Sequence, residues 1–475
     1  MKKHIRLSIL TATVLAICLL AALPSVAQNP YSRWKFDPIS FNPPKPERFV
    51  LDNGLVVYFL PNHQLPVVTM SALVRAGEVY VPADKAGLAG IAGDGLVTGG
   101  TATKPPDEID EQIESLGIQW SGDIGLESGQ FSMNCLSKDL GTALPLFAEL
   151  LMKPRFDSSR VQLAVANALE DLRRQNDSPG RIVRREFSKL VYGDHPYGRS
   201  PSEKSLGSLT RGDAVGFHER FFHPNTIILA VSGDLDVAAL KSTLQTLFGS
   251  WKKADVSYPE VATPGTNASP GVYQINKDLN QTNIRFGHLG IDRHNPDRHA
   301  VRVLNYILGG GGFTSRMIAK VRSDSGWAYS VGTAFTGADK GGLFLATCQT
   351  KTETTAKALA LMEWVVEDVR AHGIREEELE TAKDAILNSD VFNYDEPDKI
   401  VENYAWEEYQ GFPPDQLQKD VEAIKAVTKA DVDAAAAKYL HPDQYTILAV
   451  GKIDAFDSLL SKFGNVKTMT LPETP

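Results

Sequence analysis

The chain has 475 residues, of which 43% are hydrophobic and 23% charged, proportions typical of a globular protein with sizeable cores. Its formal net charge is −9 and no basic block is interleaved with aromatic side chains, so we do not expect a nucleic-acid partner. Three cysteines, one of them in the N-terminal leader, are too few for a disulfide framework.

The N-terminus predicts a secretory signal peptide over residues 1–27. A basic start, an apolar run and small residues before a cleavage point follow one another in the usual order: Lys2, Lys3 and Arg6, then Ile9 to Leu23, then Ser25 to Ala27. Because Pro24 closes a run that is short for a membrane span, we expect cleavage after Ala27 and no membrane association afterwards. Cys18 follows the bulky Ile17, so lipid tethering at that cysteine is the disfavoured alternative. The mature chain is expected to be periplasmic or secreted.

The first elements after this leader are predicted to be a hairpin, a strand and a glycine-rich helix. Asp52-Asn53-Gly54 lies between apolar runs within Phe49 to Leu60, a strong hairpin signal. A further strand is expected over Val67 to Val74. Leucines, an isoleucine and alanines recur at helical spacing within Gly87 to Thr101. This helix contains Gly90, Gly93 and Gly95, each costing about 1 kcal/mol relative to alanine, so tertiary packing must hold it.

The rest of the chain alternates helices and strands and repeats itself. Three segments recur in the same order with nearly constant shifts: Gly87 to Gly100 in His299 to Gly312, Gly129 to Cys135 in Gly342 to Cys348, and Leu209 to Asp236 in Val427 to Asp454. We therefore predict an α+β protein of two homologous domains, 45–252 and 272–470, joined by a linker over 253–271. Each domain should be a mostly antiparallel sheet with helices packed on one face. The cysteines at equivalent strand positions are expected to be buried free thiols.

The frame around the glycine-rich helix resembles the zinc helix of pitrilysin/insulinase-type metallopeptidases, G-L-A-H-x-x-E-H followed by a spacer and G-T. The chain keeps the Gly-Leu-Ala start and the Gly-Thr end, as well as Leu51-Asp52-Asn53-Gly54-Leu55 and Arg75-Ala76-Gly77 upstream. Gly90 stands at the first His, Gly93 at the Glu and Asp94 at the second His.

The resemblance also locates the family's third zinc ligand, a Glu about 77 residues beyond the second His. That position is Asp171, in a stretch from Ala168 to Arg174 that resembles the family's E-E-I-R-R segment. The adjacent Glu170 is expected on a solvated helix face. Catalytic zinc generally needs three protein ligands, usually including imidazole, and a general base. We therefore expect no metal and no cofactor in this chain; a peptidase using an unusual metal is the weakest alternative.

A second segment of the resemblance lies in the second domain. Ser315 to Val331, SRMIAKVRSDSGWAYSV, resembles the family's L-x-x-x-L-R-x-x-x-G-L-A-Y-S-V, with Arg322 and Tyr329 at its Arg and Tyr. The resemblance implies that these two side chains bind the substrate carbonyl and stabilise the tetrahedral intermediate. From the residues alone, a surface ion pair for Arg322 and a half-buried strand position for Tyr329 remain the alternative.

The resemblance runs from Phe49 to about Gly464 and implies a two-domain fold of the processing-peptidase type. It further implies a half-length member that acts as the non-catalytic subunit of a heterodimer. Zinc is then expected in a homologous partner subunit, and unfolded peptide as the substrate. The alternative is a stand-alone peptide-binding or assembly scaffold without enzymatic role.

Overall fold

A computed structural model describes residues 42–266 and 268–471. The predicted signal peptide, its cleavage point and Cys18 lie outside the described residues and stay predictions. In the part of the chain that the structure describes, no helix combines the length and the apolar character needed to cross a bilayer.

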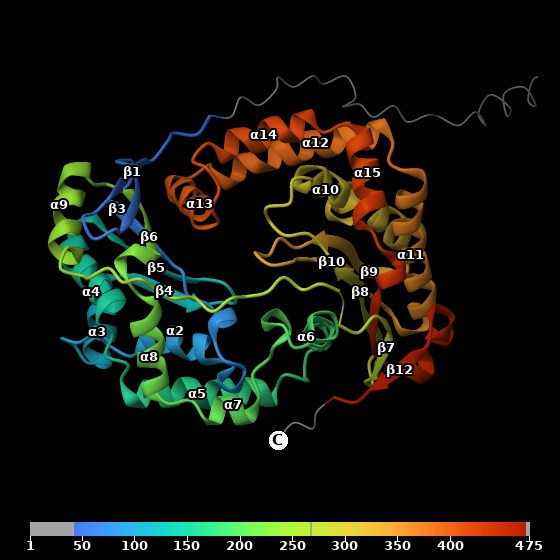
Figure 1. Cartoon of the computed structure of the whole chain (residues 1–475), viewed down its shortest axis with the longest axis horizontal. Coiled ribbons are helices and arrows are strands. Elements are labelled where there is room, and N and C mark those ends of the chain that lie inside the picture. Colours follow the sequence, from blue (N-terminus) through green and yellow to red (C-terminus); the bar gives the residue numbers. More distant parts are fainter. Residues whose placement is uncertain (1–41, 267, 472–475) are drawn as a thin grey trace, which may run out of the picture. The chain divides into compact units, whose positions relative to one another are not determined.

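The described residues form two six-stranded sheets (Figure 1). The strand order is β1-β2-β6-β3-β5-β4 in the first sheet and β12-β7-β11-β8-β10-β9 in the second. Strand β2 runs parallel to β6, and β7 runs parallel to both β11 and β12, while the other neighbours are antiparallel. The first sheet consists of β1 (Glu47–Val50), β2 (Val56–Pro61), β3 (Val67–Val74), β4 (Gln119–Ile124), β5 (Gly129–Leu136) and β6 (Ile227–Gly233). The second consists of β7 (Gly271–Asn276), β8 (Gln281–Leu289), β9 (Ala328–Phe335), β10 (Leu343–Lys351), β11 (Thr446–Gly451) and β12 (Val466–Met469).

Helices connect these strands in each half. Those of the first half are α2 (Leu88–Thr98), α3 (Pro106–Leu116), α4 (Leu140–Met152), α5 (Ser158–Arg173), α6 (Pro179–Tyr192), α7 (Glu203–Gly207), α8 (Arg211–Phe221) and α9 (Val237–Phe248). Those of the second half are α10 (Arg298–Asn305), α11 (Thr355–His372), α12 (Glu376–Asp390), α13 (Pro397–Tyr409), α14 (Gln416–Ala426) and α15 (Lys429–Tyr439). Two π-helical segments, η7 (Tyr306–Gly310) and η9 (Ile318–Asp324), follow α10.

The predicted fold class and duplication are confirmed, because the two sheets share one topology. Strands β2, β6, β3, β5 and β4 take the same order as β7, β11, β8, β10 and β9. The last strand of each repeat follows a helix that starts with the same capping box, set by Thr210 before α8 and by Thr428 before α15. Cys135 on β5 and Cys348 on β10 occupy matching strands as buried free thiols.

Alternate residues of the first sheet belong to two different cores. Val57 and Phe59 of β2 pack with the helices of their own half. Tyr58 and Leu60, which point the other way, pack against Ile400 and other apolar residues of α13 from the second half. The opposite face of the sheet is therefore covered by a helix that comes from far along the chain.

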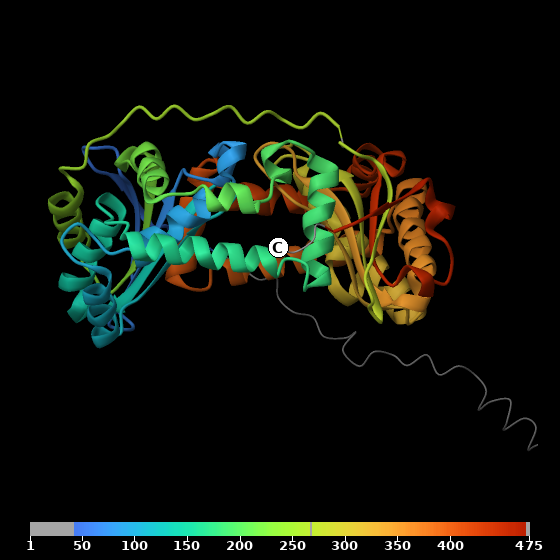
Figure 2. The ribbon, with the colours of Figure 1, turned by 90° about the horizontal axis from the view of Figure 1, so that it is seen from below.

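The second sheet is covered in the reciprocal way. Its inner face packs against helices of its own half. On its other face α6 packs against β8 and β11 (Figure 2), and Ile182 and Phe187 of α6 share one apolar cluster with Tyr273 and Ile275 of β7. Fully burying such a side chain contributes about 1.5–3 kcal/mol. Each half thus lends one helix to the other, which the prediction of helices on one face did not anticipate.

The predicted hairpin turn at Asp52-Asn53-Gly54 is present, and a further glycine ends α3. The hairpin between β1 and β2 closes through the Gly54 N–H, which donates to the Leu51 carbonyl at 2.8 Å. Gly54 has φ +90°, a conformation that favours glycine. Gly117 has φ +63° and ends α3 as an αL cap.

Candidate functional site

Helix α2 is capped by a carboxylate from outside the helix. Glu78 Oε1 accepts the Gly87 N–H at 2.6 Å, and Oε2 accepts the Ala89 N–H at 3.1 Å. Burial raises the pKa of Glu78, while these two backbone hydrogen bonds act in the opposite direction. A carboxylate at a helix N-terminus satisfies donors that lack intrahelical acceptors and interacts favourably with the helix dipole. This contact, together with the buried apolar residues of α2, holds a helix with three internal glycines.

The two glycines that resemble lost catalytic positions lie on different faces of α2. Gly90 is exposed, and a Cβ built there would meet no atom within 4 Å. Gly93 is buried against the edge strand β4, where a Cβ would lie 3.0 Å from the Ile124 backbone nitrogen and 3.4 Å from the Asp123 Cα. The absence of a side chain at Gly93 therefore allows β4 to pack directly on the helix.

Three carboxylates from three elements come close together beside this contact. Burial raises the pKa of Asp94 on α2, and the negative charges of Asp123 on β4 and Asp171 on α5 raise it further. The structure thus places Asp94 and Asp171 near each other and adds Asp123, which sequence reasoning missed. Glu170 instead pairs with Arg174, whose Nε lies 2.9 Å from Oε1. The three carboxylates create a negative field that favours cationic groups.

These residues do not fit a catalytic zinc ion. The donors at the family's ligand positions are Asp94 and Asp171, without imidazole or thiolate, and Gly93 offers no base. In the described residues, no group of three His, Cys, Asp or Glu side chains is arranged to hold a metal ion. That the chain works without a metal stays a prediction.

Arg322 and Tyr329 lie on two packed elements, η9 and β9, at one edge of the second sheet. Arg322 is exposed on η9, and Tyr329 is 72% exposed on the edge strand β9, against which η9 packs. The Arg322 guanidinium lies 5.1 Å from the ring centroid of Phe313, which is itself 74% exposed. Helix α2 packs against β4, α5 and α8, whereas η9 packs against β9 and α11. The structure therefore keeps the Arg/Tyr pair and the carboxylates on different elements.

Phe313 is a further candidate that sequence reasoning missed. It stands alone among glycines, Thr314 and Ser315 after the run Gly309 to Gly312. An isolated aromatic side chain in such a loop has no helical or strand periodicity to bury it, and this could have marked it as a surface contact.

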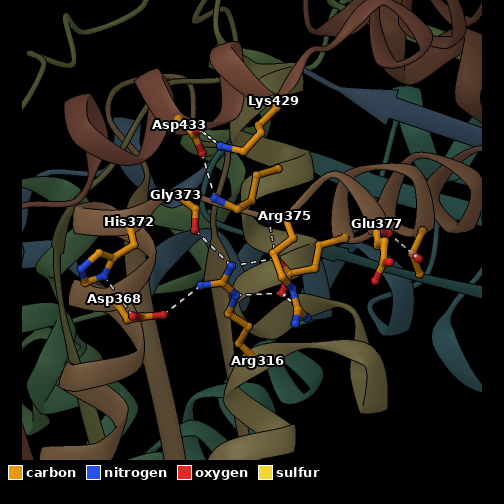
Figure 3. Close-up of polar contacts among 11 residues, drawn as sticks. Arg316, Asp368, His372, Gly373, Arg375, Glu377, Lys429 and Asp433 are labelled. Carbon is orange, nitrogen blue, oxygen red and sulfur yellow. Dashed lines mark hydrogen bonds and ion pairs between the residues drawn. The ribbon is translucent and has the colours of Figure 1, made fainter.

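The segment that carries Arg322 is anchored by Arg316, which lies two residues before η9 (Figure 3). Its guanidinium binds both oxygens of Glu378, at 2.8 and 2.7 Å, and donates to Asp368 and the Gly373 carbonyl at 3.0 Å. The bidentate geometry fixes the orientation of the carboxylate on α12 relative to the Arg322 segment. Arg316 is thus a positioning residue for the exposed Arg/Tyr corner.

This anchor makes stability depend on pH in the acid range. Burial alone would raise the pKa of Glu378, but hydrogen bonds and charge from Arg316 and Arg375 lower it from 4.5 to about 2. Because the folded-state pKa is depressed, the stabilisation is complete above about pH 4.5 and is lost as the pH falls through about 2. We expect Glu378→Gln to be less stable than wild type in urea at pH 7, with the difference narrowing progressively below pH 4. Glu377→Gln, the exposed neighbour on the same helix, is the control; an equal pH profile for both variants would contradict the assignment.

A polar cluster around Glu127, in the turn between β4 and β5, joins the two sequence halves. Its carboxylate accepts hydrogen bonds from Tyr197, from Arg293 and from the Asp339 N–H, the last at 2.9 Å, and its carbonyl accepts the Tyr409 O–H at 2.8 Å. A cavity of about 210 Å³ adjoins this cluster.

The motif Arg75-Ala76-Gly77 helps to build this junction. A Cβ on Gly77 would lie 2.5 Å from the Leu126 carbonyl, so only glycine lets the Glu127 turn approach β3. Arg75 donates to the Tyr409 carbonyl at 2.9 Å and lies over its ring. A motif that resembles a family signature therefore has a structural role in this chain.

Two family models match successive parts of the chain. The model described as insulinase (peptidase family M16) matches residues 56–203, and the one described as peptidase M16 inactive domain matches residues 208–386. An uncharacterized zinc protease of Rickettsia felis is 25% identical over 389 residues, covering 79% of this chain and 91% of that protein. One of Mycobacterium bovis is 27% identical over 403 residues, covering 83% and 91%.

Solved structures give the same picture at the level of the fold. The crystal structure of a peptidase M16 inactive domain from Pseudomonas fluorescens matches with a TM-score of 0.77 and 25% identity, over 86% of this chain and 98% of that one. The periplasmic protease PqqL from Escherichia coli matches with a TM-score of 0.72 and 16% identity, over 92% of this chain and 50% of that one.

Proposed function

The chain belongs to the insulinase family of peptidases, M16, as a half-length member, and on this basis we propose that it is the zinc-less subunit of a periplasmic zinc metallopeptidase. In this role it supplies Arg322 and Tyr329 to the active site of a homologous, zinc-bearing partner subunit that cleaves unfolded peptides.

One observation carries this proposal: the chain presents the Arg/Tyr pair at an exposed corner while lacking zinc donors of its own. In the described part of the chain, Arg322 makes no ion pair and contacts only the exposed ring of Phe313 through its guanidinium. Tyr329, at 72% exposure, holds its hydroxyl in the open. A guanidinium and a phenol without internal partners are suited to a group that arrives from outside the chain.

The chemistry of the pair follows from charge. When a peptide carbonyl is attacked, negative charge develops on its oxygen. The Tyr329 hydroxyl can donate a hydrogen bond to that oxygen, and the Arg322 guanidinium adds a permanent positive charge. Because such donors act mainly where charge develops, they raise kcat more than they tighten substrate binding.

The edge strand β4 supports a role in holding peptide. Among the described residues it pairs only with β5, so its other backbone edge is unpaired there and suited to strand addition. Asp123 lies on this strand, and its charge together with those of Asp94 and Asp171 favours peptides with basic side chains.

To test the proposal, the chain is co-expressed with a zinc-bearing homologue and the complex is purified. The rate at which the complex cleaves a quenched fluorescent peptide is then measured. We expect Arg322→Ala and Tyr329→Phe each to lower kcat by about 10²-fold, the usual size for loss of one oxyanion donor, with complex formation unchanged. Lys320→Ala is a matched control, since it removes an exposed cation from the same helical segment.

Two results would decide against the proposal. Unchanged activity of the double variant in a verified complex would remove the shared site. Peptide binding by this chain alone, together with failure to recover any zinc-bearing partner, would favour the scaffold role instead.

A further inference from the structure

The second half has a groove that is separate from the elements that carry the candidate site residues. It is bounded by α11, by the 3-10 turn η12 (Pro442–Gln444) and by strands β7, β11 and β12. Two adjoining cavities of about 770 and 430 Å³ form it and share Glu363, Pro442, Asp443 and Tyr445. The residues that line it come from none of α2, α5, η9 or β9.

The floor of the groove holds a buried hydroxyl without a partner. Tyr445 is 8% exposed, with its ring packed against Phe286 at 4.8 Å between centroids. Among the described residues its hydroxyl oxygen is buried and has no hydrogen-bond partner. Leaving a polar group in this state costs about 1–3 kcal/mol, so a hydroxyl kept there is suited to a ligand that completes its hydrogen bonding.

The walls add carboxylates whose charge is not neutralised within the groove. Burial raises the pKa of Glu363 to about 7, and no ion pair of the described residues includes it. The two nearby cations are otherwise engaged: Arg370 pairs with Glu367 at 3.2 Å, and Lys467 lies over the ring of Tyr273. The lining carboxylates Glu363, Glu367 and Asp443 outnumber the cations Arg370 and Lys467, so the groove carries a net negative charge when Glu363 is ionised.

An exposed indole completes the set. Trp364 is 52% exposed on the same helix as Glu363 and lines the larger cavity. An aromatic face beside carboxylates favours an alkylammonium or guanidinium group, through cation–π attraction and charge-assisted hydrogen bonds. The same carboxylates repel anions, and in the described residues they form no group able to hold a metal ion.

We propose that this groove binds the basic side chain of a lysine or arginine residue presented by a peptide or partner protein. The ammonium or guanidinium group binds Glu363 and the Tyr445 hydroxyl, and its alkyl stem lies along Trp364. The site is separate from the proposed shared peptidase site and can be tested on this chain alone.

The experiment is isothermal titration of the mature chain with single-residue probes at pH 8.5, where Glu363 is ionised. Nα-acetyl-lysine amide and Nα-acetyl-arginine amide are expected to bind in about the millimolar range, typical of a ligand of this size. The norleucine analogue, which keeps the alkyl stem without the charge, is expected to bind more weakly by a factor of about ten or more. Absence of binding by the lysine and arginine probes, or equal binding of norleucine, overturns the proposal.

Variants separate recognition from stability. Glu363→Gln is expected to weaken lysine binding about tenfold, whereas Glu376→Gln, an exposed carboxylate on α12, leaves it unchanged. Tyr445→Phe is expected to weaken binding several-fold without lowering the melting temperature, since it removes an unpaired hydroxyl and keeps the packed ring. Tighter binding of pentylamine than of the lysine probe would assign the groove to free amines and overturn the side-chain assignment.

Discussion

Replacing Glu127 by alanine is expected to lower the free energy of unfolding by about 3 kcal/mol, the lower end of the usual cost of breaking a buried ion pair, because Glu127 and Arg293 are partly buried. The variant would leave the largely buried Arg293 guanidinium without its carboxylate and remove the acceptor of both the Tyr197 hydroxyl and the Asp339 N–H. The measurement is chemical denaturation of the mature chain, followed by both tryptophan fluorescence and circular dichroism.

The matched control is Glu170→Ala, which removes an exposed carboxylate paired with Arg173 and Arg174. Surface pairs of this kind contribute about 0–1 kcal/mol. Glu127 joins the two sequence halves, so its loss is expected to make the halves unfold less cooperatively. The unfolding curves followed by fluorescence and by circular dichroism should then no longer coincide. A Glu127 variant as stable as the control would show that exchange of α6 and α13 alone couples the halves.

Restoring the zinc motif is expected to destabilise the chain without creating a zinc site. In a variant with Gly90→His, Gly93→Glu, Asp94→His and Asp171→Glu, the new side chain at position 93 must enter the contact with β4. Overpacking of this kind costs about 1–3 kcal/mol, and the displaced strand is the edge proposed to hold peptide. Metal analysis should find well below one zinc per chain.

Single substitutions to alanine isolate the steric effect. Gly90→Ala faces open space and is expected to stabilise the chain by about 0.5–1 kcal/mol, because alanine favours helix more than glycine does. At Gly93 the same gain is offset by a Cβ that lies 3.0 Å from the Ile124 nitrogen. Equal stabilisation by alanine at both positions, or one zinc per chain in the restored variant, would contradict this expectation. It would show that β4 can move to accommodate a side chain at position 93.

The expected stability and metal content of these variants bear on the proposal that this chain serves a zinc site in a partner subunit. The family's histidine positions hold other residues here, and the backbone of β4 packs directly on Gly93. We therefore expect that restoring the motif alone does not recover a metal site. In the proposed complex, the contribution of this chain to peptide cleavage would rest on the exposed side chains of Arg322, Tyr329 and Phe313.

Local structure and duplication could be predicted from the sequence because they depend on neighbours. The apolar run Val67 to Val74 predicts strand β3 with its observed bounds, and Asp52-Asn53-Gly54 predicts the first hairpin because glycine tolerates the backbone conformation that its turn requires. The segments repeated between the halves lie on matching helices and strands, since homologous sequences bury the same faces. The family frame likewise identified Asp94 and Asp171. Their spacing along the chain does not by itself require that they lie near each other.

Tertiary structure alone decided the features that depend on distant contacts. The exchange of α6 and α13 places Phe187 and Ile400 in the other half's core, although each helix is amphipathic whichever sheet it meets. Glu127 looks like a solvated turn residue until folding brings Arg293 to it across 166 residues. In the sequence, Gly93 is the position at which the family has its catalytic Glu. In the structure it is also the position at which β4 packs against α2. Periodicity reports which face of an element is apolar, but the partner of that face depends on how the whole chain packs.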